Sequence, residues 1–185
     1  HRDLHLSIRR QRQMCIRDSF LDERIFGPLQ MVDTAFYVPV AEVGRVATRH
    51  RLNAQGVLQR LSGRPPLTAM PQGPTGGAGL YSTADDYLRF TQMLLNGGEL
   101  NGVRLLSPRT VEMMRTNHLS KEATRNMRPG MGFGMDFMVY MDPAAAGEPH
   151  SPGSYYWLGI DGTWFCCLLY TSPSPRDATL SGNPA

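Results

Sequence analysis

The stretch GGAGLYSTADDYLRFTQMLLNGGELNGVRLLSP, residues 76–108, carries the strongest structural signals in the chain. Its centre predicts a helix over 83–96, with Ser82 as the N-cap and Asp85, three residues on, as the capping-box partner. One face of this predicted helix is apolar and contains Ala84, Tyr87, Leu88, Thr91, Leu94 and Leu95. The run Asn96-Gly97-Gly98 supplies the glycine that commonly ends a helix.

The residues after this helix predict two more local elements. Asn101-Gly102 suits a two-residue type I′ turn, so residues 99–104 are expected to form a tight hairpin. Ser107-Pro108 combines an N-cap with proline at the first helical position, which predicts a second helix to about Thr116. Val111, Met114 and Met113 are its expected inward residues.

The segments on either side of residues 76–108 also carry signals of local structure. Residues 20–30 resemble the end of an amphipathic helix that stops at Gly27-Pro28. Residues 31–50 suggest short extended pieces, and residues 51–79, rich in Gly and Pro, suggest a long irregular loop. Further along, turn residues separate three apolar runs, which predicts antiparallel strands. Those expected strands are 131–140, 154–159 and 163–166.

Composition limits the class of protein. A chain of 185 residues is long enough for one domain with a real core, and it holds no apolar run long enough to span a bilayer. The net charge of +3 is uneven, because residues 1–19 hold five Arg and two Asp while residues 20–166 hold 13 basic and 13 acidic side chains. A nucleic-acid partner is therefore not expected from the central segment.

The two ends have an explanation outside the protein. Residues 9–18, RRQRQMCIRD, are the translation of a transposase-type sequencing adapter, and residues 167–177, CLLYTSPSPRD, are the translation of the partner adapter. We therefore expect 1–19 and 167–185 to be translated adapter and 20–166 to be the biological segment. The alternative at the protein level is a short Arg-rich arm that binds nucleic acid.

The central segment contains no complete catalytic set by pattern alone. None of its serines lies in a Gly-x-Ser-x-Gly elbow or three residues before a lysine, and Ser82 and Ser107 are better explained as helix caps. The three histidines, His50, His118 and His150, are scattered among polar residues without metal-ligand spacing. Asp85-Asp86 opens the predicted helix, where acidic side chains favour the helix dipole; a catalytic carboxylate pair is the weaker interpretation.

The order of several motifs resembles one family. GGAGLYSTADDY over 76–87, LLNGGELNGVRLLSP over 94–108, IFGPLQMVDT over 25–34 and GFG over 132–134 resemble the serine β-lactamase-related family. This family comprises class C β-lactamases, penicillin-binding D-alanyl-D-alanine carboxypeptidases and family VIII-type esterases. In the third motif Gln30 replaces the usual Gly. The resemblance implies an α+β fold, an antiparallel sheet with flanking helices, of which residues 20–166 are a partial domain.

The resemblance also implies a chemistry. The family's nucleophile lies in Ser-x-x-Lys and is activated by that Lys and by the Tyr of Tyr-x-Asn, because serine is a weak nucleophile until a neighbour takes its proton. Both motifs are expected upstream of Phe20, so no catalytic residue is expected in this fragment, which is predicted to be inactive. No metal or cofactor is implied.

One family motif does fall within the chain. Trp157-Leu158-Gly159 takes the place of the Lys/His-Thr/Ser/Gly-Gly strand, and the backbone N–H of Ile160 is the implied second donor of the oxyanion hole. Trp157 resembles the esterase branch, because it offers no charge to a substrate carboxylate. Leu158 and Asp161 depart from the family pattern and could narrow the site. Without the resemblance, residues 155–157 read simply as a strand with a packed aromatic face.

The sequence therefore predicts a parent serine hydrolase, esterase-leaning, that acts on a small ester or β-lactam-like molecule through an acyl-enzyme. Two alternatives stay open: a family member that has lost catalysis and serves as a binding or scaffold protein, and a D-Ala-D-Ala carboxypeptidase or β-lactamase. Trp157 argues against the last of these.

Overall fold

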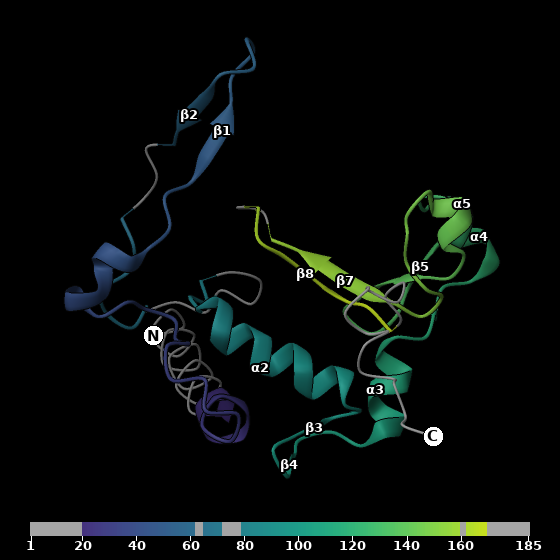
Figure 1. Cartoon of the computed structure of the whole chain (residues 1–185), viewed down its shortest axis with the longest axis horizontal. Coiled ribbons are helices and arrows are strands. Elements are labelled where there is room, and N and C mark those ends of the chain that lie inside the picture. The colour runs from purple at the N-terminus through teal and green to yellow at the C-terminus, as the bar shows by residue number, and fades with distance from the viewer. Residues whose placement is uncertain (1–19, 62–64, 72–78, 160–161, 170–185) are drawn as a thin grey trace, which may run out of the picture. The chain divides into compact units, whose positions relative to one another are not determined.

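The structure is a computed structural model, and it describes residues 20–61, 65–71, 79–159 and 162–169. The chain divides into two compact units, His1–Phe90 and Thr91–Ala185. Figure 1 labels the elements of both units. Among the described residues, no helix is both long and apolar enough to cross a membrane.

The first unit begins with a short helical segment. A π-helical turn, η1 (Asp22–Phe26), is followed by a 3-10 helix, η2 (Val40–Arg45). The helix expected at the start of 20–30 is confirmed, and it ends at Gly27, whose N–H donates to the carbonyl of Asp22. The buried apolar side chains of this part are Phe26, Leu29, Met31, Phe36 and Val38.

The segment predicted as a long irregular loop contains a hairpin instead. Strands β1 (His50–Leu52) and β2 (Leu58–Arg60) pair antiparallel, with Leu52 opposite Leu58. The Asn53 side chain builds the turn, because its Oδ1 accepts from the backbone N–H groups of Gln55 and Val57. Every residue of both strands is exposed, so the burial alternation that reveals a strand in a sequence is absent.

Helix α2 (Ala84–Leu95) is present as predicted, but its cap and its buried face differ. The Thr83 hydroxyl, not that of Ser82, accepts from the N–H of Asp86. Asp86, Met93 and Leu94 are buried, whereas the expected inward residues Leu88 and Leu95 are exposed. The glycine ending is confirmed, since the N–H of Gly98 donates to the Met93 carbonyl at 2.8 Å.

The local elements after α2 form where they were predicted, except that the second helix ends at Met114 and that Met113, expected to face inward, is exposed. Strands β3 (Glu99–Leu100) and β4 (Val103–Arg104) form the predicted hairpin. Asn101 and Gly102 both have positive φ, 51° and 81°, as a type I′ turn requires. Helix α3 (Pro108–Met114) starts at Ser107, whose side chain accepts from the Thr110 N–H.

A four-stranded antiparallel sheet dominates the second unit. Its spatial order is β5 (Met131–Phe133), β6 (Met138–Tyr140), β7 (Tyr155–Leu158) and β8 (Trp164–Cys167). The last two strands confirm the prediction for 154–159 and 163–166. The single strand predicted over 131–140 is wrong, because the chain reverses between β5 and β6, where Asp136 takes a φ of 73°.

Two short helices complete this unit: α4 (Lys121–Arg125) and α5 (Pro143–Ala146), both beside β5 in Figure 1. The core on this side of the sheet is a cluster of buried and partly buried apolar side chains. Its members are Met131, Tyr140, Ala146, Met127, Met138, Tyr156 and Cys166. Helices flanking an antiparallel sheet make this an α+β fold, as predicted.

Candidate active site

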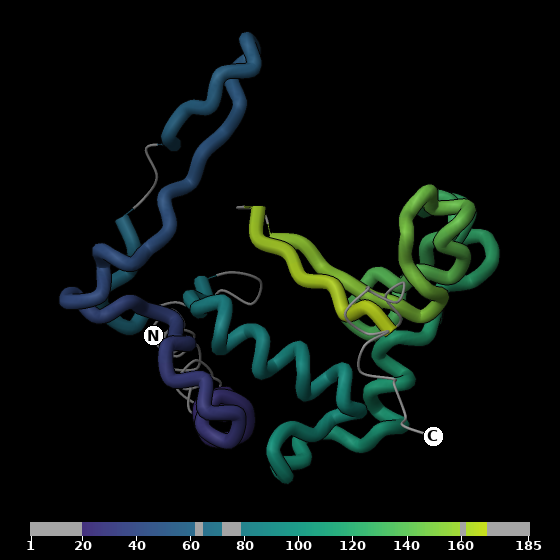
Figure 2. The backbone as a smooth tube through the Cα atoms, viewed as in Figure 1, coloured from purple at the N-terminus to yellow at the C-terminus, as the bar shows by residue number. Residues whose placement is uncertain are grey.

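The motif strand β7 ends in exposed side chains. Figure 2 shows β7 and β8 running together to one end, where Trp157 lies opposite Phe165 and Leu158 lies opposite Trp164. Trp157 is 44% exposed and Leu158 is 59% exposed. Because successive residues of a strand point to opposite faces, Trp157 and Leu158 present their side chains on different faces of the sheet.

An aromatic neighbour orients the ring of Trp157. Phe133, the last residue of β5, meets it edge to face, with ring centroids 5.4 Å apart and planes at 82°. At the start of the same strand, Tyr155 is fully buried, and its ring centroid lies 5.1 Å from that of Phe137. The strand therefore has a packed aromatic part at Tyr155 and a partly open one at Trp157, which is held in place but accessible.

Gly159 closes the strand at a very tight turn. Its N–H donates to the Thr163 carbonyl at 2.6 Å, and its own carbonyl accepts from the N–H of Gly162 at 3.0 Å. A Cβ added at Gly159 would overlap the Thr163 hydroxyl, so a larger residue here would force the Thr163 side chain to move. Ile160, the expected oxyanion-hole donor, and Asp161 lie outside the described residues.

Strands β7 and β8 and the residues beside them, 154–159 and 162–169, contain no charged side chain. This part of the sheet therefore presents only apolar and neutral groups to a ligand. An isolated carboxylate would find no ion pair from β7 or β8, and burying an unpaired charge is costly. The local chemistry suits an uncharged group.

Each of the other sequence candidates has a local contact of its own. His118 Nε2 lies 2.7 Å from the Met113 carbonyl, and His50 Nδ1 lies 3.1 Å from that of Thr48. The His150 ring packs against Tyr140, with centroids 4.4 Å apart. Ser107 is a helix cap, as predicted, and Ser120 caps α4. Within the described part of the chain, no group of three His, Cys, Asp or Glu side chains is arranged to hold a metal ion.

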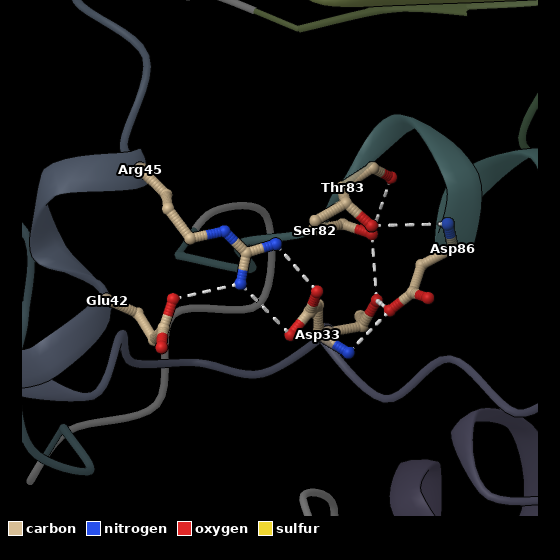
Figure 3. A network of polar contacts seen from close by, with 7 residues as sticks. Asp33, Glu42, Arg45, Ser82, Thr83 and Asp86 are labelled. Carbon is tan, nitrogen blue, oxygen red and sulfur yellow. Dashed lines mark hydrogen bonds and ion pairs between the residues drawn. The ribbon is translucent and has the colours of Figure 1, made fainter.

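The first unit contains a polar network that the sequence did not reveal (Figure 3). Asp86 is only 4% exposed, and its carboxylate is the centre of the network. It accepts from the backbone N–H of Asp33 at 2.7 Å and from the hydroxyl of Thr34 at 2.8 Å. The Ser82 hydroxyl lies 2.8 Å from that of Thr34, which explains why Ser82 is not the cap of α2.

The outer part of the network is an exposed ion pair. Arg45 donates to the carboxylate of Asp33 at 2.8 Å and to that of Glu42 at 3.0 Å. The guanidinium of Arg45, mainly through its hydrogen bond, lowers the pKa of Asp33 below its ordinary value. The two hydrogen bonds to Asp86 connect residues 33–34 to the start of α2, so the role of Asp86 is structural. This geometry does not support the interpretation of Asp85-Asp86 as a catalytic carboxylate pair.

Comparisons with known proteins bear on this strand and sheet. The sequence model of the Beta-lactamase family matches residues 17–171. Protein Rv1367c of Mycobacterium tuberculosis is 42% identical over 187 residues, which cover 89% of this chain and 47% of that protein. Esterase EstB of Burkholderia gladioli is 37% identical over 94 residues, 50% of this chain and 22% of the esterase.

A solved structure supports the same fold. EstCE1, described as a hydrolase with promiscuous acyltransferase activity, superposes with a TM-score of 0.67 at 24% identity, over 82% of this chain and 42% of that one. The chain belongs to the beta-lactamase family, with a β-lactamase/transpeptidase-like fold. It spans about half the length of Protein Rv1367c.

Proposed function

We propose that the parent protein is a serine hydrolase that cleaves small carboxylic esters. The serine of an upstream Ser-x-x-Lys attacks the ester carbonyl and forms an acyl-enzyme, while the Lys and the Tyr of Tyr-x-Asn take its proton and return one to the departing alcohol. Water then releases the acid and restores the serine. The N–H of Ile160 donates to the oxygen that becomes negatively charged during both steps.

The observation that carries this proposal is Trp157 at the motif position. Lys or His there would help to hold a substrate carboxylate, whereas the indole of Trp157 is neutral. Its ring is partly exposed and is oriented by Phe133, and no charged side chain stands beside it on β7 or β8 over 154–159 and 162–169. The similarity to Esterase EstB over 94 residues supports the same preference for an ester.

The test uses the complete protein, expressed from the gene recovered with its flanks. We expect hydrolysis of p-nitrophenyl acetate and butyrate, and little or none of a chromogenic cephalosporin or a D-Ala-D-Ala peptide. Alanine in place of the upstream nucleophilic serine is the matched control and should abolish turnover. Absence of Ser-x-x-Lys and Tyr-x-Asn, or a purified protein that binds esters without turning them over, would favour the non-catalytic scaffold instead.

The variant Trp157→Lys tests the role of this position. We expect it to lose ester turnover and to gain affinity for acyl donors that carry a carboxylate, since a cation can then pair with it. Trp157→Phe, which keeps a neutral aromatic ring, is the control and should retain most of the ester activity. Equal effects of both variants would mean that Trp157 serves packing alone.

A further inference from the structure

Phe133, whose ring orients Trp157, is itself held by the loop that follows helix α3. Within the described residues β5 is an edge strand of the four-stranded sheet, so the backbone groups on its outer side face no further strand. At Phe133 both of these groups are nevertheless used. The N–H donates to Oδ1 of Asn117 at 3.0 Å, and the carbonyl accepts from the N–H of His118 at 2.9 Å. Residues 117 and 118 therefore pair with Phe133 as a neighbouring strand would.

The side chain of Asn117 is fixed within its own loop. Its Oδ1 also accepts from the N–H of Leu119 at 3.1 Å, and its Nδ2 donates to the Leu119 carbonyl at 3.4 Å. With the bond from Phe133, three hydrogen bonds hold this half-buried amide in one orientation. The position of Asn117 therefore determines where the backbone of Phe133 lies.

The two glycines of the GFG motif allow this loop to approach the strand. A Cβ at Gly132 would lie 2.7 Å from Oδ1 of Asn117, and a Cβ at Gly134 would overlap the carbonyl oxygen of Met114, the last residue of α3. A side chain at either glycine would push the loop away from β5. The motif is thus explained by what packs on it, and its central residue, Phe133, is the one that contacts the Trp157 ring.

We propose that Asn117 is a positioning residue for the ester reaction, acting on Trp157 through the backbone and the ring of Phe133. The pairing of β6 with β7 ends at Met138 and Tyr156, so Trp157 lies one residue beyond the last pair. On this side the edge-to-face contact with Phe133, at a centroid distance of 5.4 Å, holds the indole. If Phe133 moves, the indole loses the neighbour that orients it. The role rests on the proposed function, in which Trp157 faces the substrate.

The kinetic test measures kcat and KM of the complete enzyme for p-nitrophenyl butyrate. Asn117→Ala removes the acceptor of the Phe133 N–H, and we expect KM to rise severalfold, up to about tenfold, the range that an aromatic pair contributes. We expect kcat to change less than about twofold, because the indole binds the ester and takes no part in the proton transfers. Asn117→Asp keeps an acceptor oxygen at the same position and should restore KM.

A double variant tests whether Asn117 acts through Phe133. In a Phe133→Leu background, Asn117→Ala should bring no further rise in KM, because the ring that transmits its effect is gone. Asn53→Ala is the matched control, since it also removes an Oδ1 that accepts from two backbone N–H groups in a turn. It should leave KM unchanged.

A spectroscopic measurement reports on Trp157 without any turnover. The complete protein is labelled with fluorinated tryptophan, and the fluorine NMR resonance of Trp157 is identified by its absence from Trp157→Phe. Asn117→Ala should shift or broaden this resonance, and Asn117→Asp should return it to its wild-type position. The resonance of Trp164 on β8 is the internal reference and should not move.

The outcomes separate this role from the proposed function. No ester turnover by the wild-type enzyme would overturn the proposed function, and the Trp157 resonance would still test the positioning. An unchanged resonance in folded Asn117→Ala, or a changed resonance with an unchanged KM, would overturn the positioning role alone. Equal effects of Asn117→Ala in the wild-type and Phe133→Leu backgrounds would show a general role in the fold and would also overturn it. If Asn117→Ala does not fold, Asn117→Gln, which displaces the amide by one methylene, replaces it in both measurements.

Discussion

At the scale of single residues, Gln30 carries backbone strain. Its φ is +56°, in the left-handed region that costs most residues energy. Its side chain is exposed, so removing the side chain loses little packing. The motif over 25–34 normally has Gly at this position, and the positive φ of Gln30 gives the reason, because glycine adopts this conformation without a steric cost.

We expect Gln30→Gly to raise the free energy of unfolding by about 0.5 to 1 kcal/mol, because relief of the left-handed strain exceeds the added entropy of the unfolded chain. Urea denaturation measures it. Gln30→Ala is the control, since it removes the side chain but keeps the strain, and it should bring no gain. If the glycine variant were no more stable than the alanine variant, the backbone at Gln30 would not be strained.

The two acidic residues at the start of α2 should behave very differently. Asp86 is buried and accepts two hydrogen bonds, whereas Asp85 is exposed. Asp86→Ala leaves the Asp33 N–H and the Thr34 hydroxyl without their acceptor, so we expect a loss of about 2 to 3 kcal/mol of stability. Asp85→Ala removes a charge from the same helix turn and should cost only about 0.5 kcal/mol. Thermal or urea denaturation compares the two; equal losses would show that the helix dipole, not the network, explains Asp86.

At the scale of elements, the sheet has a pH dependence of known sign. Tyr140 of β6 is buried, and burial raises the pKa of its phenol from 10.0 to about 12, with Glu148 adding to the rise. The folded state therefore prefers the neutral phenol. Its contribution to stability is full below pH 10, and it is lost as the pH rises toward 12.

We expect the urea midpoint to fall between pH 10 and pH 12, and to fall less steeply in Tyr140→Phe, which has no proton to lose there. The slope of the variant does not vanish, because burial also raises the pKa of the Cys166 thiol to about 11. Identical slopes for the wild type and the variant would show that Tyr140 ionises equally easily in both states.

Elements defined by local turn chemistry could be predicted from the sequence. The end of α2 at Asn96–Gly98, the hairpin at Asn101-Gly102 and the cap at Ser107 depend on residues within a few positions of one another, and all three are confirmed. The β1–β2 hairpin was missed because none of its residues is buried. Residues 131–140 were predicted as one strand because apolar side chains continue through the turn.

Features that depend on distant contacts could not be predicted. The buried face of α2 and the network around Asp86 are set by residues such as Asp33 and Thr34, about fifty positions away in the chain. Of the candidate site, the strand that carries Trp157 and Leu158 could be predicted, and β7 confirms it. The contact between Phe133 and Trp157 and the exposure of Trp164 required the structure.

At the scale of the whole molecule, we propose that the native protein is joined to other sequence at 19/20 and 166/167. Long reads of the source genome should depart from this sequence at both junctions and should encode Ser-x-x-Lys and Tyr-x-Asn upstream. Reads that run unchanged through both junctions would make the Arg-rich arm real protein and would reopen its interpretation as a nucleic-acid-binding segment.

The hairpin formed by β7 and β8 also gives the chain a built-in optical probe. The chain has two tryptophans, Trp157 and Trp164, and both lie at the same end of this hairpin. Intrinsic indole emission of these 185 residues therefore reports on a single place. Since Trp164 is the more exposed of the two, acrylamide should quench the emission of Trp157→Phe more strongly than that of Trp164→Phe. A molecule that binds at this end of the hairpin should change the wavelength or the intensity of tryptophan emission, so its binding can be followed without a label.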